Sequence, residues 1–127
     1  MKNNILGLRT TIYQVTDLEE ATRWYSKAFN TEPYFNEAFY VGFDIAGYEL
    51  GLQPDNTVAA HKNNSVVAYW GVDDIEATYN RFLALGALTE EAPNEVGGGI
   101  FVATVRDPWG NFIGLILNPH FDLSKTK

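Results

Sequence analysis

At 127 residues and 46% hydrophobic composition, the chain suffices for a single domain, residues 1–127, with a core that needs no disulfides, and it contains no cysteine to form them. Its formal charge of −7 disfavours a nucleic-acid backbone or an anionic membrane surface as a partner, because both require neutralising Lys and Arg side chains. No apolar run approaches the roughly 20 residues of a membrane span and no signal-peptide pattern opens the chain, so we expect a cytoplasmic protein.

The first part of the chain, residues 5–53, predicts the element order β-α-β-β-β. Ile5–Val15 is rich in β-branched residues and predicts a strand, and Asp17 then caps a helix whose apolar residues recur at helical spacing. The helix is expected to end at Asn30, and a short strand is expected around Tyr34–Phe35.

Residues 40–53 show the period of two that predicts a β-hairpin turning at Ala46–Gly47. This turn pairs position 45 with 48, 44 with 49, and 42 with 51. Asp44 and Glu49 are therefore predicted to lie side by side, on the face opposite the helix.

The second part, residues 65–118, repeats this order after a polar linker, residues 54–64, and a polar tail follows at 119–127. Gly86 is placed to end the helix, and Gly97–Gly99 is interpreted as a flexible connection that serves as a flap over a binding site. The predicted elements are a strand at 65–72, a helix at 74–85, a weak strand at 90–91, a strand at 100–106, a turn at 107–110 and a strand at 112–117.

The two parts share a sequence repeat. Val15-Thr16-Asp17-Leu18-Glu19-Glu20-Ala21 is echoed by Val72-Asp73-Asp74-Ile75-Glu76-Ala77-Thr78, 57 positions later. Each copy is too small to bury its own apolar face, so we expect the copies to pack or pair together. A groove between them is the expected place for a ligand.

These motifs resemble the vicinal oxygen chelate superfamily of glyoxalase I, bleomycin-resistance proteins and extradiol dioxygenases. The resemblance rests on the two Val-x-Asp-(Leu/Ile)-Glu helix starts, on Arg23-Trp24-Tyr25, and above all on Asp107-Pro108-Trp109-Gly110-Asn111 before the last strand. It covers residues 7–118. It implies an α+β fold of two tandem βαβββ modules that form a half-open barrel with a concave cleft, commonly in a homodimer.

Metal-dependent members of this superfamily hold a divalent ion with a His or Gln on each module's first strand and a Glu on its last. The matching positions here are Thr10 and Val67 on the first strands, and Gly51 and Gly114 on the last strands. None of these side chains is a useful ligand for Mg²⁺, Mn²⁺, Fe²⁺ or Zn²⁺. The resemblance therefore points to its metal-free branch, with no cofactor, whose bleomycin-resistance members act by sequestering a drug.

Strand alternation predicts which residues line the ligand site, because side chains facing away from the helices share one face. Tyr40, Tyr69 and Phe112 are expected to stack on a planar or cationic ligand. The predicted ligand-binding residues are Thr10, Ile12, Gln14, Tyr40, Asp44, Glu49, Gly51, Gln53, Val67, Tyr69, Phe112 and Gly114.

Two features of this lining allow alternative interpretations. The Asp44 and Glu49 carboxylates either receive a cationic group or share a proton for acid–base work, with the pKa of one raised by the other, or form a solvated pair at a hairpin tip. The glycines at 42, 51, 71 and 114 either leave space for a bulky ligand or mark bulges and tight bends.

The sequence thus supports two functional hypotheses. The first is a metal-free protein that binds and sequesters a small molecule with cationic and aromatic character. The second is a glyoxalase-like lyase, isomerase or dioxygenase with a non-standard site, for which Asp44, Glu49 and His61 are the available donors.

Overall fold

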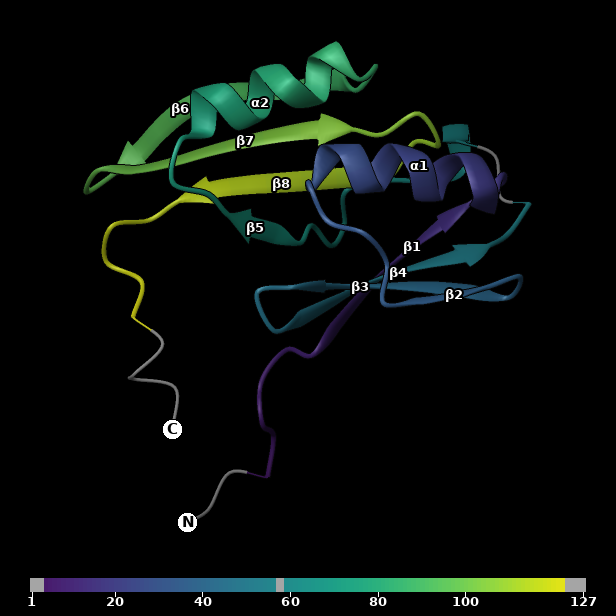
Figure 1. Ribbon diagram of the computed structural model, residues 1–127. Coiled ribbons are helices and arrows are strands. Elements are labelled where there is room, and N and C mark those ends of the chain that lie inside the picture. Colours follow the sequence, from purple (N-terminus) through teal and green to yellow (C-terminus); the bar gives the residue numbers. More distant parts are fainter. Residues whose placement is uncertain (1–3, 57–58, 123–127) are drawn as a thin grey trace. The chain divides into compact units, whose positions relative to one another are not determined.

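The computed structural model describes residues 4–56 and 59–122. The chain forms two compact units, residues 1–58 and 59–127, and the boundary between them in the sequence falls inside the predicted linker. Each unit contains a four-stranded mixed sheet and one α-helix in the predicted order β-α-β-β-β, as Figure 1 shows. The predicted α+β fold of two tandem βαβββ modules is therefore confirmed.

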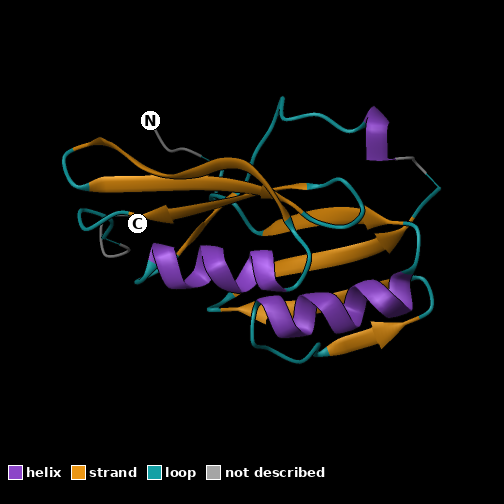
Figure 2. Cartoon of the chain, turned by 90° about the horizontal axis from the view of Figure 1, so that it is seen from above, coloured by secondary structure: helices purple, strands orange, loops and turns teal. Residues whose placement is uncertain are grey.

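The first unit is built around the sheet order β1-β4-β3-β2. β1 and β4 are parallel, whereas β4, β3 and β2 are joined by antiparallel pairing. The helix α1 contacts β3 and β4 and lies along one face of this sheet (Figure 2). The elements are β1 (Thr10–Val15), α1 (Leu18–Ala28), β2 (Phe35–Glu37), β3 (Tyr40–Ile45) and β4 (Tyr48–Pro54).

The core of the first unit lies between α1 and the sheet. Alternate residues of β1 are buried toward the helix, and those between them are exposed on the opposite face. The ring of Tyr25 stacks on Tyr13 and Phe29, with centroids 5.6 and 5.8 Å apart. The buried hydrophobic residues are Tyr13, Val15, Ala21, Trp24, Tyr25, Ala28, Val41, Phe43, Leu50 and Leu52. The predicted site residues of this unit lie on the face of the sheet opposite α1.

The second unit has the equivalent sheet order β5-β8-β7-β6, with β5 and β8 parallel. Its helix α2 packs on β6, β7 and β8. The buried hydrophobic residues are Ile75, Phe82, Ala87, Ala103, Val105, Ile113 and Leu115. The elements are a short 3₁₀ helix (Ala59–His61), β5 (Tyr69–Gly71), α2 (Ile75–Ala84), β6 (Leu88–Gly97), β7 (Ile100–Arg106) and β8 (Phe112–Leu117).

The repeated aspartate begins both helices. Asp17 accepts a hydrogen bond from the backbone N–H of Glu20, and Asp74 accepts one from that of Ala77, both at 3.1 Å. The chain leaves α1 through Asn30 at φ 51° and leaves α2 through Gly86 at φ 102°. The helix boundaries predicted from these residues are confirmed to within one or two residues.

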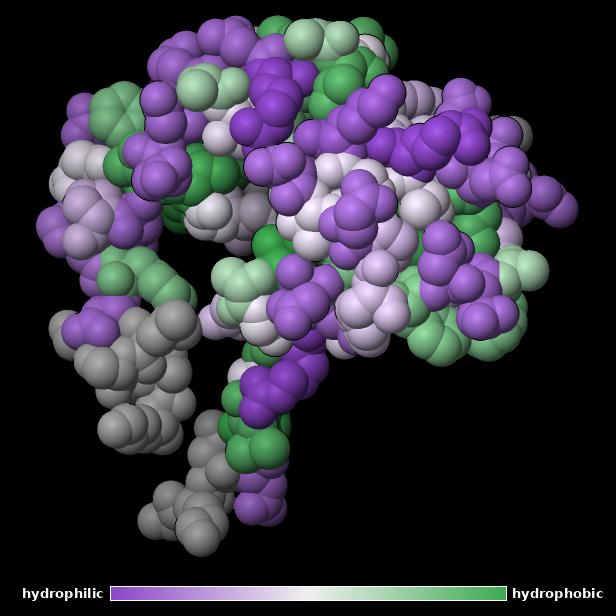
Figure 3. All heavy atoms as spheres, viewed as in Figure 1, coloured by the Kyte–Doolittle hydropathy of each residue, from purple (hydrophilic) through white to green (hydrophobic). Residues whose placement is uncertain are grey.

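Two predicted strands are shorter than the sequence suggests. β1 begins at Thr10 rather than Ile5, because Gly7 adopts φ +100° and the guanidinium of Arg9 donates to the carbonyl of Leu6. The residues before it are exposed, and Figure 3 shows hydrophobic side chains along this segment. β5 spans only Tyr69–Gly71, so the prediction of a strand from Ser65 to Val72 is wrong at its beginning.

The largest correction concerns β6, which is a ten-residue strand rather than a weak one at Glu90–Glu91. Its pairing with β7 shifts register at three points, so its side chains do not alternate regularly. Gly97–Gly99 forms the turn of the β6–β7 hairpin, and its role as a flap over a binding site stays a prediction. All three glycines have positive φ, and the N–H of Gly99 donates to Glu95 at 2.9 Å.

The polar linker contains the 3₁₀ helix Ala59–His61, while residues 57–58 and the last part of the predicted tail, 123–127, lie outside the described residues. Among the helices that the structure describes, none has the length and apolar character needed to cross a membrane.

Candidate ligand-binding site

The face of the first sheet opposite α1 carries eight of the predicted site residues. The register places Asp44 beside Glu49 and Gly42 beside Gly51, as the hairpin pattern predicts. β1 extends this face, because Thr10 pairs with Glu49 and Ile12 with Gly51. The face thus brings together Thr10, Ile12, Gln14, Tyr40, Asp44, Glu49, Gly51 and Gln53, with Gln14 donating to Gln53 at 3.4 Å.

Glu49 is the centre of this face. Its Oε1 accepts a hydrogen bond from the hydroxyl of Tyr34 at 2.5 Å, and its Oε2 accepts one from the hydroxyl of Tyr40. Each carboxylate oxygen therefore has a phenol donor, an arrangement that orients the carboxylate. Tyr34 is not among the residues predicted to bind the ligand. It lies just before β2 and is held there by a hydrogen bond from its N–H to the carbonyl of Gly42.

The pKa values of both tyrosines are raised by this carboxylate. Burial and the hydrogen bond to Glu49 raise the pKa of Tyr40 well above its usual value of 10.0. The pKa of Tyr34 is also raised, chiefly by its own hydrogen bond to Glu49. Both hydroxyls thus stay protonated donors at neutral pH, and neither is an activated nucleophile or base.

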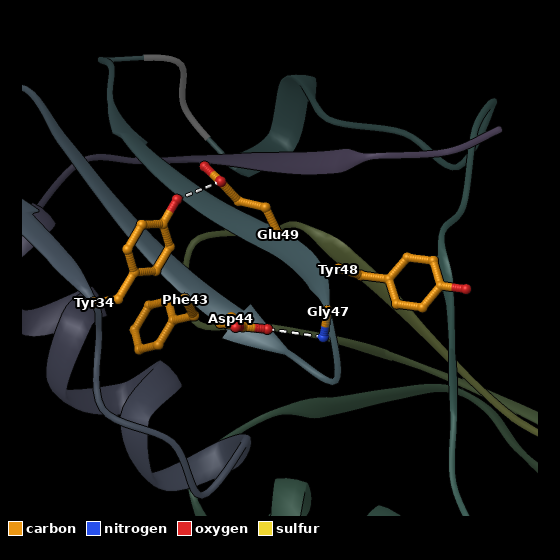
Figure 4. Close-up of a pocket in the computed structure, with 6 residues that line it drawn as sticks. All are labelled: Tyr34, Phe43, Asp44, Gly47, Tyr48 and Glu49. Carbon is orange, nitrogen blue, oxygen red and sulfur yellow. Dashed lines mark hydrogen bonds between the residues drawn. The ribbon is translucent and has the colours of Figure 1, made fainter. Parts of the chain in front are cut away.

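Asp44 and Glu49 have separate roles although they are cross-strand neighbours. The Oδ1 of Asp44 accepts a hydrogen bond from the N–H of Gly47 at 2.8 Å and so stabilises the hairpin turn. In Figure 4 the two carboxylates point in different directions, with Glu49 toward Tyr34 and Asp44 toward Gly47. Neither carboxylate forms an ion pair with a basic side chain within the described ranges, where the recorded ion pair joins Arg23 and Glu19.

These residues line an open pocket of about 190 Å³ at the hairpin (Figure 4). Its two carboxylates are flanked by the aromatic ring of Tyr34, while the ring of Tyr48 points away from Glu49. The lining residues are Tyr34, Phe43, Asp44, Gly47, Tyr48 and Glu49. A small pocket with two acidic groups and aromatic walls suits a positively charged group.

The glycines of this sheet serve close packing of tyrosine rings. A β-carbon at Gly51 would lie 2.6 Å from the Cζ of Tyr40, and one at Gly42 would lie 3.1 Å from the Cε1 of Tyr34. The space left by these glycines is therefore filled by the rings that hold Glu49, rather than left open for a bulky ligand.

The remaining predicted site residues lie in the second unit. Tyr69 pairs with Gly114, and its ring covers that glycine, since a β-carbon there would lie 2.6 Å from the Cδ2 of Tyr69. Phe112 shares this face two residues before Gly114. Val67 lies before the start of β5 and is half-buried, so its predicted place on a strand is wrong.

The metal-ligand positions inferred from the sequence do not fit a divalent ion. Gly51 and Gly114 offer no donor atom, and a tyrosine ring occupies the place where each would carry a side chain. Thr10 is a single hydroxyl and Val67 an alkyl group, whereas divalent ions require several carboxylate or imidazole donors. The residues from 4 to 56 and 59 to 122 contain no group of three or more His, Asp or Glu side chains placed to hold a metal.

Comparison with known proteins agrees with this architecture. Residues 7–115 match the glyoxalase/bleomycin resistance protein/dioxygenase superfamily, and the chain belongs to that family. A probable lactoylglutathione lyase from Vibrio cholerae is 31% identical over 121 residues, covering 85% of this chain and 88% of that protein.

Solved structures with low sequence identity share the fold. A glyoxalase-related enzyme from Fulvimarina pelagi has a TM-score of 0.76 at 16% identity, covering 96% of this chain and 95% of its own. A bleomycin resistance determinant encoded on the transposon Tn5 has a TM-score of 0.70 at 18% identity, covering 89% of this chain and 98% of its own. These likenesses extend over nearly the whole of both chains.

Proposed function

We propose that this protein is a metal-free member of its family that binds and sequesters a small molecule with a cationic group and an aromatic ring. The observation that carries the proposal is the tyrosine ring over Gly51, whose hydroxyl is bonded to Glu49. At the position where the family resemblance places a metal-binding Glu, this protein has an aromatic ring that is hydrogen-bonded to the Glu49 carboxylate.

The chemistry of the pocket supports a cationic ligand. Asp44 and Glu49 contribute two carboxylates that have no basic partner in the described part of the chain. An ammonium or guanidinium group that enters the pocket would be attracted to both and would contact the Tyr34 ring. Such a cation–π contact contributes about 0.5–2 kcal/mol, depending on how far water is excluded.

Calorimetric titration with bleomycin-type compounds and other aromatic cations tests the proposal. We expect binding by the unchanged protein and a loss of about tenfold or more in affinity for the double variant Asp44→Asn, Glu49→Gln. The matched control is Glu19→Gln, Glu20→Gln, which removes the same charge from exposed positions on α1. Equal losses in both double variants would show that only the net charge matters, and the pocket assignment would be wrong.

Elemental analysis tests the metal-free part independently. Protein purified without chelators is expected to hold less than one transition-metal ion per ten chains, because the inherited positions have no donors. One stoichiometric ion per chain would overturn this part of the proposal.

A second candidate function is a glyoxalase-like lyase, isomerase or dioxygenase with a non-standard site. It is favoured by the 31% identity to a probable lactoylglutathione lyase, an activity that belongs to that relative by name. Formation or breakdown of lactoylglutathione, measured with and without added Ni²⁺, Zn²⁺ or Mn²⁺, distinguishes the two functions. Turnover that is lost in Glu49→Gln would favour the enzyme.

We also propose a homodimer that acts in the cytoplasm on a small molecule rather than on nucleic acid or a membrane. The family resemblance supports the dimer, and the net charge of −7 supports the choice of partner. Sedimentation equilibrium at micromolar concentration should give twice the chain mass of 14.2 kDa.

A further inference from the structure

Arg106 lies on the open face of the second sheet, at the end of β7. It pairs across the sheet with Phe112 of β8, and its guanidinium carbon lies 4.8 Å from the centre of that ring. The neighbouring Val105 and Ile113 are buried toward α2, so strand alternation places Arg106 and Phe112 on the opposite face. The guanidinium therefore lies over an aromatic ring, within the range of a cation–π contact.

This arginine has no carboxylate partner within 4.0 Å in residues 4–56 and 59–122. The adjacent Asp107 does not serve, because its carboxylate accepts from the N–H groups of Trp109 and Asn111 and from the Asn111 side chain. The Nε–H of Arg106 is buried and donates to no acceptor in the described structure. An unpaired buried donor destabilises the folded chain, and such groups are uncommon in native proteins.

The surroundings of Arg106 are aromatic rather than acidic. Phe112 and Gly114 follow one another on the same face of β8, and the Tyr69 ring lies over Gly114 while remaining 45% exposed. A guanidinium over one aromatic ring, with a second ring on the same face of the sheet, matches a planar molecule that carries a carboxylate. A doubly charged phosphate fits less well in a chain of net charge −7, because its repulsion is larger.

We propose that the open face of the second unit binds an aromatic carboxylate, with Arg106 pairing its carboxylate group and with Phe112 and Tyr69 contacting its ring. This site is separate in chemistry from the acidic pocket of the first unit and goes beyond the function proposed above. The carboxylate of such a ligand supplies the acidic partner that Arg106 lacks within residues 4–56 and 59–122.

Isothermal titration with 2-naphthoate, its neutral analogue naphthalene-2-carboxamide and inorganic phosphate tests the site. We expect 2-naphthoate to bind, and both other probes to bind at least tenfold more weakly. Arg106→Met should reduce the naphthoate affinity about tenfold or more, and Arg106→Lys should retain part of it because the charge remains without the planar fork. Arg23→Met, which removes an exposed arginine from α1, is the matched control and should leave the affinity unchanged.

Thermal unfolding separates this role from a structural one. Met keeps the length of the side chain against Phe112 but removes both the unpaired Nε and the cation–π contact, whose effects on stability oppose each other. Arg106→Met should therefore stay folded, with a melting temperature close to that of the unchanged protein. Absent naphthoate binding or equal binding of the carboxamide would each overturn the proposal. Equal binding of inorganic phosphate would overturn the assignment to aromatic carboxylates. Because the acidic pocket is tested with cations and this face with anions, either proposal can fail alone.

Discussion

The ring of Tyr40 lies over the α-carbon of Gly51, so that a β-carbon at this position would be only 2.6 Å from the ring carbon Cζ. The second unit repeats the relationship with Tyr69 and Gly114, also at 2.6 Å. In both units a glycine on the last strand of the module lies under a tyrosine ring from a neighbouring strand. In each unit a tyrosine ring thus occupies the space that the side chain of a metal-binding Glu would need at this position.

Gly51→Ala should destabilise the first unit because the added methyl group displaces the Tyr40 ring and separates its hydroxyl from Glu49. We expect a loss of about 1–3 kcal/mol in the free energy of unfolding, measured by urea denaturation. Gly71→Ala is the matched control: a β-carbon there meets nothing within 4 Å, and the change should be within about 0.5 kcal/mol of zero.

A double-mutant cycle then tests the stated cause. In a Tyr40→Ala background the ring is absent, so Gly51→Ala should cost much less than it does alone. If the two substitutions are additive, the ring is not what makes glycine necessary at position 51.

The Tyr40–Glu49 hydrogen bond should appear in alkaline unfolding. Because the pKa of Tyr40 is raised in the folded protein above its ordinary value of 10.0, the protonated hydroxyl stabilises the fold fully below about pH 10. That contribution is lost as the pH rises further, through the folded-state pKa. Tyr40→Phe should therefore lower stability by about 1–2 kcal/mol at pH 8 and flatten its decline between pH 10 and 11.5.

Denaturant titrations at several pH values provide the measurement. Tyr48→Phe is a suitable control, because in Figure 4 this ring points away from Glu49. A decline that is as steep in Tyr40→Phe as in the unchanged protein would mean that other groups cause it.

The hairpin and the helix boundaries were predictable because local chemistry determines them. Ala46–Gly47 fixes the pairing of Asp44 with Glu49, and the capping aspartates fix where both helices begin. β6 was not predictable, because its three register shifts remove the alternation by which a strand is recognised.

The tyrosine partners of Glu49 depend on three-dimensional packing. Tyr34 lies 15 positions from Glu49 and outside any regular element, so no spacing rule links the two residues. The glycines at 42 and 51 were the available indication, since glycine inside a strand often marks a close approach by another group. They were interpreted as space or as bends, whereas the approaching groups are the Tyr34 and Tyr40 rings.

The repeated aspartates should contribute equally to the two units. Asp17→Ala and Asp74→Ala each remove one hydrogen bond to a backbone N–H at 3.1 Å, and each should cost about 1 kcal/mol in the free energy of unfolding. Glycine at either position should cost only a few tenths of a kcal/mol. A cost above 3 kcal/mol at one site would mean that the aspartate does more there than begin a helix.

Asp107 should matter more to stability than either capping residue. It is 3% exposed, and its carboxylate accepts from the backbone N–H groups of Trp109 and Asn111 and from the Asn111 side-chain amide, at 2.7 to 2.9 Å. Asp107→Ala leaves these donors without their acceptor in a buried turn, so we expect a loss of about 2–4 kcal/mol by urea denaturation.

Two further variants show which part of that loss comes from the hydrogen bonds. Asp107→Asn keeps the oxygen that serves the backbone N–H groups but places an amide opposite the Asn111 amide, so it should lose roughly half as much as the alanine variant. Asp73→Ala, a change at an exposed aspartate just before the residue that caps α2, should stay within about 0.5 kcal/mol of the unchanged protein. If Asp107→Ala falls in that same narrow range, then water replaces the carboxylate in this turn and the turn does not depend on it.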